Sequence, residues 1–259
     1  MTLSKDFEYK DADGETMKGV LHYPEKHPSL TIRHLITLFY FGNVTGKVPA
    51  VLVLHAFGGC GEFESGRAAA LAKLGYVALA ADVYGKGKKG GTVQENFALM
   101  KPLIADRMGV LKKRLLAAVE AVRSLPEVDK ERVGAIGYCF GGLCALDLAR
   151  HNVGLKAAVS FHGTLTPIPE VELVPVTASI QVHHGDADIH IPATAVNDFM
   201  QEMRTRKADW SFTSYGNAEH GFTEPHIGEL GAPGVSYNKE ADRRSWAATV
   251  AFLKERLEL

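Results

Sequence analysis

The hydrophobic positions along the chain change from alternation near the start to continuous apolar runs after about fifty residues. Two short segments, DFEYKDA and MKGVLHYP, alternate apolar and polar residues on either side of Asp13-Gly14, which predicts an antiparallel hairpin. The run from Pro49 to Phe57 is apolar throughout, as in a strand buried on both faces of a sheet. Beyond it, helical spacing and apolar runs alternate.

This alternation predicts a mostly parallel sheet with helices on both faces, which is an α/β fold. The further strands are expected over residues 76–83, 132–138, 156–161, 179–183 and 209–215. The helices are expected over residues 63–74, 93–124 with a break near Pro102, 141–151, 192–207 and 239–257. No repeat or linker divides the chain, so we predict a single domain over residues 1–259.

One segment does not fit this pattern. Between His27 and Val44 the chain carries LITLFYF (Leu35 to Phe41), where only a short connection into the next strand is needed. We expect an added strand, a lid over the site or a surface for self-association.

Charge and composition exclude several classes of function. The chain has 29 basic and 30 acidic side chains and a formal net charge of −1. This balance predicts no positive electrostatic potential that would attract nucleic acid or an anionic membrane. The longest apolar run is far too short to cross a bilayer, and no signal peptide is expected. Three cysteines do not make a disulfide framework. We therefore expect a reduced, cytoplasmic protein, a monomer or homodimer, that acts on a small molecule.

The strongest candidate for chemistry is Cys139. The segment GYCFGG follows the apolar strand RVGAIGY and precedes a helix, which is the G-x-S-x-G nucleophile motif with cysteine in place of serine. Glycines must flank such a residue because its turn is tight, and the helix N-terminus beneath it favours a thiolate. A buried structural cysteine is the alternative. Cys60 and Cys144 lie outside the motif and are expected to be passive.

A base and an acid follow later in the chain, each after a strand, in the order that this motif requires. His220 lies in YGNAEHGF and is expected to accept the thiol proton, and Asp188 in HHGDADIHIP is expected to orient it. Asp186 directly follows a glycine and more plausibly shapes the turn. The same stretch, with His183, His184 and His190, offers metal ligands as an alternative, but neighbouring strand residues point to opposite faces. We therefore expect no metal and no cofactor.

Acyl transfer also needs donors for a developing negative oxygen. The backbone N–H of Phe140, which follows the nucleophile, is expected to be one. Phe57, in the loop after PAVLVLH, is expected to supply the other; a simple glycine turn is the alternative.

With these motifs, the chain resembles the dienelactone hydrolase family. The resemblance rests on LVLHAFGG, LAKLGYVALAADVYGKG, VGAIGYCFGG, HGDADIHIP and AEHGF. It implies an eight-stranded α/β-hydrolase that hydrolyses lactones and esters without a metal or cofactor, with a triad that maps onto Cys139, His220 and Asp188.

The chain departs from that family at positions that matter for activation and specificity. Members of the family carry a glutamate that contacts the thiol, and this chain has Ala56 at that position. Activation of the Cys139 thiol is therefore expected from His220, or from the side chain of Glu62 or Glu64. An arginine that binds a substrate carboxylate is replaced by Glu224, and a second arginine by Lys86. These changes favour a neutral substrate. Substrate contacts are expected at the following residues: Tyr84, Lys86, Phe161, Phe222 and Glu224.

Four functions remain open at this stage. The leading one is a cysteine-dependent esterase or lactonase. The second is attack by the same thiolate on activated neutral phosphotriesters, as a side activity. The others are a binding protein with an inactive pocket, which the complete triad disfavours, and a redox thiol protein, which would need a resolving cysteine near Cys139.

Overall fold

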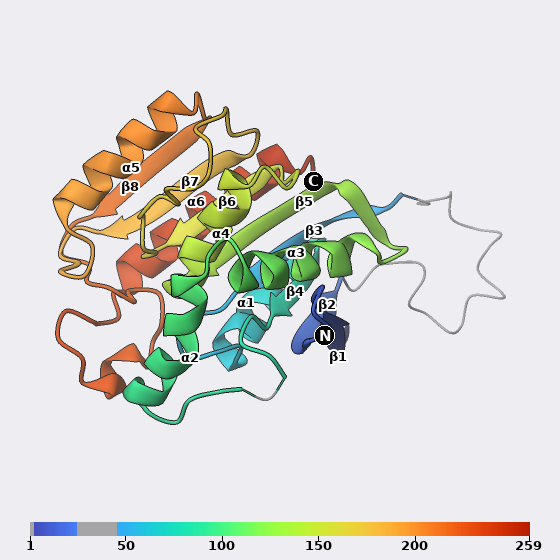
Figure 1. The fold of residues 1–259 in the computed structure, drawn as a ribbon, viewed down its shortest axis with the longest axis horizontal. Helices are drawn as coiled ribbons and strands as arrows, with labels where there is room; N and C mark the ends of the chain where they lie inside the picture. The colour runs from blue at the N-terminus through green and yellow to red at the C-terminus, as the bar shows by residue number, and fades with distance from the viewer. Residues whose placement is uncertain (1–2, 25–45, 87) are drawn as a thin grey trace.

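One eight-stranded sheet runs through the computed structural model, which describes residues 3–24, 46–86 and 88–259. The strands follow the order β1-β2-β4-β3-β5-β6-β7-β8 (Figure 1). Their bounds are β1 Leu3–Lys10, β2 Thr16–Tyr23, β3 Val48–Leu54, β4 Val77–Ala81, β5 Val128–Tyr138, β6 Ala157–Phe161, β7 Ser179–Gly185 and β8 Trp210–Tyr215. Strands β3 to β8 are parallel, and the β1–β2 hairpin joins antiparallel to β4.

Helices cover both faces of this sheet, as the sequence predicts (Figure 1). Their bounds are α1 Glu62–Lys73, α2 Val93–Ala105, α3 Val110–Arg123, α4 Phe140–Arg150, α5 Ala193–Thr205, α6 Lys239–Arg256 and the 3₁₀ turn η2 Ile227–Leu230. One core lies under α3, α4 and α5, and a second lies under α1 and α6. None of the helices in the described ranges is both long and apolar enough to cross a membrane.

The central strands explain why the sequence shows continuous apolar runs. In β3, Leu52 and Leu54 face the core under α3 and α4, whereas Val51 and Val53 face the core under α1 and α6. All four side chains are fully buried. Because successive strand residues point to opposite faces, a strand covered on both sides cannot alternate with polar residues.

The long helical region breaks at a different place from the one expected. Pro102 lies inside α2, which ends at Ala105, and α3 begins at Val110. The side chain of Asp106 accepts hydrogen bonds from the N–H groups of Gly109 and Val110, at 3.0 and 2.9 Å. This capping starts a new helix, so the acidic residue and not the proline sets the break. The apolar segment from His27 to Val44 lies outside the described residues.

Candidate active site

Cys139 occupies a tight turn between β5 and α4. Its backbone has φ 51° and ψ −110°, a conformation that residues with a side chain rarely adopt. A Cβ atom on Gly137 would collide with the backbone of Gly141, and one on Gly141 would collide with the carbonyl of Leu54. The two glycines of the motif are therefore required by close backbone approach, and the turn leaves Cys139 partly exposed above the sheet.

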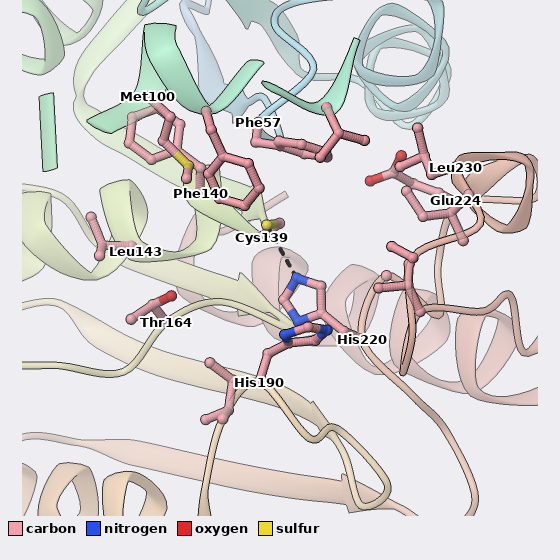
Figure 2. A pocket seen from close by; sticks show the side chains of 18 of the residues that line it. Phe57, Met100, Cys139, Phe140, Leu143, Thr164, His190, His220, Glu224 and Leu230 are labelled. Atoms are coloured by element: carbon pink, nitrogen blue, oxygen red, sulfur yellow. Dashed lines mark hydrogen bonds between the residues drawn. The ribbon is translucent and has the colours of Figure 1, made fainter. Parts of the chain in front are cut away.

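The three residues predicted as a triad lie in one hydrogen-bonded line. The Nε2 atom of His220 is 3.1 Å from the Cys139 sulfur (Figure 2). Its Nδ1 atom is 2.8 Å from Oδ2 of Asp188. The Asp188 side chain is fully buried, and that of His220 is 14% exposed. Asp186 instead accepts a 3.3 Å bond from Ser214 and does not reach His220. The preference for Asp188 over Asp186 thus agrees with the geometry.

The electrostatics of this line favour a protonated His220. Burial disfavours the imidazolium, but the negative charge of Cys139 and the bond to Asp188 outweigh it and raise the pKa of His220 to about 10. Burial likewise works against charge on Asp188, yet its bonds to His220 and to the N–H of His190 lower the pKa of that carboxyl. The arrangement stabilises positive charge on the ring between sulfur and carboxylate.

Two residues expected to donate to an oxyanion lie beside the sulfur. Phe57 and Phe140 both line the cavity at Cys139, and Figure 2 shows them on the side of the sulfur away from His220. Within the described part of the chain, neither N–H donates to an acceptor. Unpaired N–H groups at such a position are what an oxyanion requires.

The cavity beside Cys139 has a volume of about 280 Å³ and is lined mainly by apolar side chains. Its walls come from the β3 loop, α2, α4, the loop after β7 and the segment from His220 to Val235. The apolar lining includes Phe57, Val93, Phe97, Met100, Ile104, Phe140, Leu143, Ile191, Ile227, Leu230 and Val235. No lysine or arginine of the described residues lines it. This space fits a small, largely uncharged molecule.

Comparison with known proteins identifies the family. The model of the dienelactone hydrolase family matches residues 37–257. The chain belongs to the dienelactone hydrolase family. It is therefore a hydrolase of the α/β-hydrolase fold, from a family that cleaves ester bonds.

Solved and curated relatives agree with this assignment. A crystal structure of a dienelactone hydrolase-like promiscuous phosphotriesterase from metagenomic libraries superposes with a TM-score of 0.88, at 32% identity over 98% of both chains. A probable 2-oxo-3-(5-oxofuran-2-ylidene)propanoate lactonase of Bradyrhizobium is 29% identical, covering 82% of this chain and 85% of its own. An uncharacterised Caenorhabditis elegans protein is 50% identical over 155 residues, which are 59% of this chain and 98% of the worm protein.

Among the described residues, no carboxylate makes a hydrogen bond with the Cys139 sulfur. Ala56 stands at the position of the family's glutamate, and the expectation that Glu62 or Glu64 reaches the thiol is corrected for Glu64. Its buried carboxylate accepts bonds from the N–H groups of Ala56 and Gly61, at 3.3 and 2.8 Å. These bonds hold the carboxylate behind the loop, and His220 makes the side-chain contact with the sulfur.

Glu224 is the acidic residue that lines the cavity, as expected from its position four residues after His220. Burial, and next the negative charge of Glu64, raise the pKa of Glu224 to about 7, against smaller opposing effects of His220 and Arg67. Its side chain makes no hydrogen bond with another described residue. The carboxyl group therefore titrates near neutral pH in an otherwise apolar space.

Two expected substrate contacts are corrected because their side chains hold the scaffold. The Tyr84 side chain is buried, and its hydroxyl donates to the carbonyl of Phe57 at 2.8 Å. Lys86 pairs with Glu8 at the β1–β2 hairpin, with 2.6 Å between Nζ and Oε1. Neither residue lines the cavity.

The aromatic residues after β6 and β8 are also corrected. Phe161 is buried and stacks between Tyr138 and His183, with ring centroids 4.7 and 4.9 Å away. Phe222 is buried and packs edge-on against His162 at 5.2 Å. Both side chains are buried in the protein interior and do not line the cavity. A position at the end of a strand therefore does not by itself determine the direction of a side chain.

Sequence reasoning missed His190 and the face of α2. His190 lines the cavity, its ring lies edge-on to His220 at 5.4 Å, and its Nε2 lies 3.0 Å from the carbonyl of Pro233. From α2, Val93, Phe97, Met100 and Ile104 line the cavity. Their spacing of three or four residues marks one helical face, and this signal was available in the sequence.

The alternative metal reading finds no support among the described residues. Within that part of the chain, no three His, Cys, Asp or Glu side chains come together as an ion would require. His183 bonds to Tyr215 and Thr249, at 2.9 and 3.0 Å, whereas the neighbouring His184 packs against Phe212. The two rings diverge, as neighbouring strand residues must.

Proposed function

We propose that this protein hydrolyses small, neutral, largely apolar esters or lactones through a thioester on Cys139. The observation that carries this proposal is the line from Asp188 through His220 to the Cys139 sulfur, at 2.8 and 3.1 Å, at the edge of an apolar cavity. A nucleophile, a base held by a third group and two free N–H donors are the parts that acyl transfer needs.

In the first half of the reaction, Nε2 of His220 holds the proton taken from the Cys139 thiol, and the sulfur attacks the substrate carbonyl carbon. The carbonyl oxygen becomes an oxyanion that accepts hydrogen bonds from Phe57 N–H and Phe140 N–H. As this intermediate collapses, the bond to the leaving oxygen breaks, and the imidazolium gives that oxygen its proton. Asp188 stabilises the charged ring throughout.

In the second half, water replaces the leaving alcohol. His220 accepts a proton from water, whose oxygen attacks the thioester carbon, and the same two N–H groups stabilise the second oxyanion. The carbon–sulfur bond then breaks, its electron pair stays on the sulfur of Cys139, and the acid product leaves, so that Cys139 and the protonated His220 are restored. For a lactone, the alcohol and acid remain on one molecule. Each step uses the side chains and N–H groups of this site and needs no redox partner.

The lining of the cavity supports a neutral substrate. Its walls carry no described lysine or arginine that would pair with a carboxylate, and Glu224 adds negative charge as the pH rises through about 7. An anion placed there loses its hydration without gaining a partner. The proposal therefore sets this chain apart from members that bind a substrate carboxylate through arginine.

A second candidate is hydrolysis of activated neutral phosphotriesters by the same thiolate. The observation in its favour is the 32% identity, over 98% of both chains, to the dienelactone hydrolase-like promiscuous phosphotriesterase. A neutral aryl phosphotriester also suits an apolar cavity that no described lysine or arginine lines. Attack by sulfur at phosphorus would release the aryl oxygen in place of an alcohol.

One panel tests both candidates. Neutral aryl esters, lactones and aryl phosphotriesters are assayed with the wild type, Cys139→Ser and Cys139→Ala, each with and without EDTA. We expect ester or lactone turnover that is insensitive to EDTA and falls by about 10³-fold or more in Cys139→Ala. Phosphotriester turnover above that of esters would favour the second candidate. Loss of activity on chelation, restored by zinc, would contradict the cysteine mechanism.

A further inference from the structure

The two proposed oxyanion donors differ in how firmly their own chain segments hold them. The N–H of Phe140 is the first of α4, so the helix fixes its direction. Phe57 lies in a loop with Gly58 and Gly59 directly after it, and a loop of this kind has many accessible conformations. Within the loop, the N–H of Gly59 donates to the carbonyl of Ala56 at 3.2 Å, which is one restraint on the peptide that ends in the Phe57 amide.

His55 is the side chain that bonds to the same carbonyl. Its ring is fully buried, with Nδ1 at 2.6 Å from the carbonyl oxygen of Ala56 and Nε2 at 3.1 Å from the backbone nitrogen of Val83. A backbone N–H can only donate, so Nε2 must accept and Nδ1 must carry the hydrogen. Burial lowers the pKa of His55, which keeps the ring neutral and preserves this tautomer.

The bond to Ala56 fixes the peptide that ends in the Phe57 N–H. No described peptide bond is cis, so the carbonyl of Ala56 and the N–H of Phe57 point in opposite directions across one rigid plane. Holding the carbonyl against His55 therefore turns the N–H away from the ring, on the side where Ala56 and Phe57 line the cavity. Rotation of this plane would remove the donor from the oxyanion.

The neighbouring peptides of the same loop are also held by side chains. The N–H of Ala56 donates to Glu64, and the carbonyl of Phe57 accepts from the Tyr84 hydroxyl, at 3.3 and 2.8 Å. The His55 ring packs edge-on against Tyr84, with centroids 4.5 Å apart, and lies 5.9 Å from the Phe140 ring. Three consecutive peptides of the loop are thus held by hydrogen bonds to side chains. Phe57 and Phe140 themselves lie beside Cys139 (Figure 2).

We propose that His55, assisted by Tyr84, is a positioning residue of the oxyanion hole: its Nδ1–H holds the Ala56–Phe57 peptide so that Phe57 N–H faces the reacting oxygen. The inference rests on the proposed acyl-transfer function. His55 touches neither the sulfur nor the cavity, so it acts through the Phe57 amide alone.

A matched pair of variants separates the donor from the bulk of the ring. In His55→Asn the side-chain amide nitrogen stands near the place of Nδ1, so the bond to Ala56 is kept and the acceptor for Val83 is lost. In His55→Gln the amide oxygen stands near the place of Nε2, so the acceptor is kept and the donor to Ala56 is lost. Both variants lose the ring packing, so each controls for the other.

We expect kcat for a neutral aryl ester to fall by about 10- to 10³-fold in His55→Gln, with KM within about threefold, since loss of an oxyanion donor acts in the transition state. His55→Asn should recover most of that loss. Tyr84→Phe keeps its ring and should lower kcat about three- to tenfold, which tests the loop if the His55 variants do not fold. Equal losses of kcat in His55→Asn and His55→Gln would overturn the proposal. So would a wild-type kcat in His55→Gln or in Tyr84→Phe.

Alkylation by iodoacetamide distinguishes a displaced donor from a damaged triad. The sulfur displaces iodide at a saturated carbon, so the reaction needs the thiolate and forms no oxyanion. We expect the second-order rate of Cys139 alkylation in His55→Gln and Tyr84→Phe to stay within about twofold of the wild type. A parallel loss of alkylation would contradict the positioning role. If Cys139→Ala instead retained ester turnover, the proposed function itself would fail, whatever His55 does.

Discussion

Asp188 bonds to His220 across 32 residues of sequence, with 2.8 Å between Oδ2 and Nδ1, while its other oxygen accepts the N–H of His190 at 2.9 Å. Both carboxylate oxygens are therefore engaged, and the carboxylate has a single way to face the ring. This fixes the ring so that Nε2 is the atom presented to the Cys139 sulfur.

The first prediction follows from this bond. In Asp188→Asn the amide presents a donor or a weaker acceptor to Nδ1, which destabilises the imidazolium and the tautomer that deprotonates the thiol. We expect kcat to fall by about 10²- to 10⁴-fold with a small change in KM. Asp186→Asn is the matched control, because Asp186 contacts Ser214 and not His220. Equal losses in the two variants would show that the loop, and not the bond, is responsible.

The second prediction concerns the charge of the substrate. Because Glu224 lines a cavity without a described lysine or arginine, neutral aryl esters should exceed matched carboxylate-bearing esters in kcat/KM by at least about tenfold, which is about 1.4 kcal/mol. Glu224→Arg should shift this preference towards the anion, and Glu224→Gln should reduce it. Glu229→Gln, an exposed change on η2, is the control. Faster turnover of the anion by the wild type would show that Glu224 does not govern selection.

The third prediction is the pH dependence of that selection. With a pKa of about 7, Glu224 is neutral below this pH and charged above it. The ratio of anionic to neutral ester turnover should therefore fall as the pH rises from about 6 to 8, and the fall should be absent in Glu224→Gln. Using the ratio cancels the titration of the triad, which both substrates share. A ratio that does not change with pH in the wild type would contradict the assignment.

The same carboxyl group gives a stability prediction with a definite sign. Its folded-state pKa lies above the ordinary value of 4.5, so its contribution to stability is present below pH 4.5 and is lost as the pH rises through about 7. Glu224→Gln should thus match the wild type in free energy of unfolding at low pH and exceed it by roughly 1–3 kcal/mol above pH 7. Urea unfolding at pH 4.5 and 8 measures this, and a constant difference would exclude it.

The fifth prediction concerns the strained backbone of Cys139. A φ of 51° with a ψ of −110° costs a residue with a Cβ atom about 1–3 kcal/mol, and glycine avoids this cost. Glycine also gains freedom in the unfolded chain, which offsets part of the gain. Cys139→Gly should therefore be more stable than Cys139→Ala by about 1 kcal/mol, although both lack the nucleophile. A less stable glycine variant would argue against strain at this turn.

Much of the site follows from one topological rule. Cys139 follows β5, Asp188 follows β7 and His220 follows β8, and the carboxyl ends of parallel strands meet at one edge of the sheet. The sequence therefore predicts which loops converge, and the motif around Cys139 identifies the turn. Asp188 is distinguished from Asp186 by its place in the loop alone, and its contact with His220 is visible only in the fold.

The sequence did not predict which way side chains turn at those same strand ends. Phe161 ends β6 and Phe222 follows β8, close to the triad residues, yet packing against Tyr138 and His162 places their rings in the interior. Lys86 is drawn to Glu8 on the hairpin, a partner that is distant in sequence. These side-chain directions depend on packing between elements that are distant in sequence, and a local sequence pattern does not reveal that packing. The loop bonds of His55 belong to the same class.

The most direct test of the account is to trap the acyl group during turnover of a neutral aryl acetate. Rapid acid quenching followed by peptide mapping should find acetyl on the peptide that contains Cys139, with a burst of aryl alcohol that approaches one equivalent per active site. His220→Ala should abolish both, and Cys139→Ala should leave neither acetyl nor turnover above about 10⁻³ of the wild type. Near-native turnover in Cys139→Ala, without a trapped thioester in the wild type, would contradict the account.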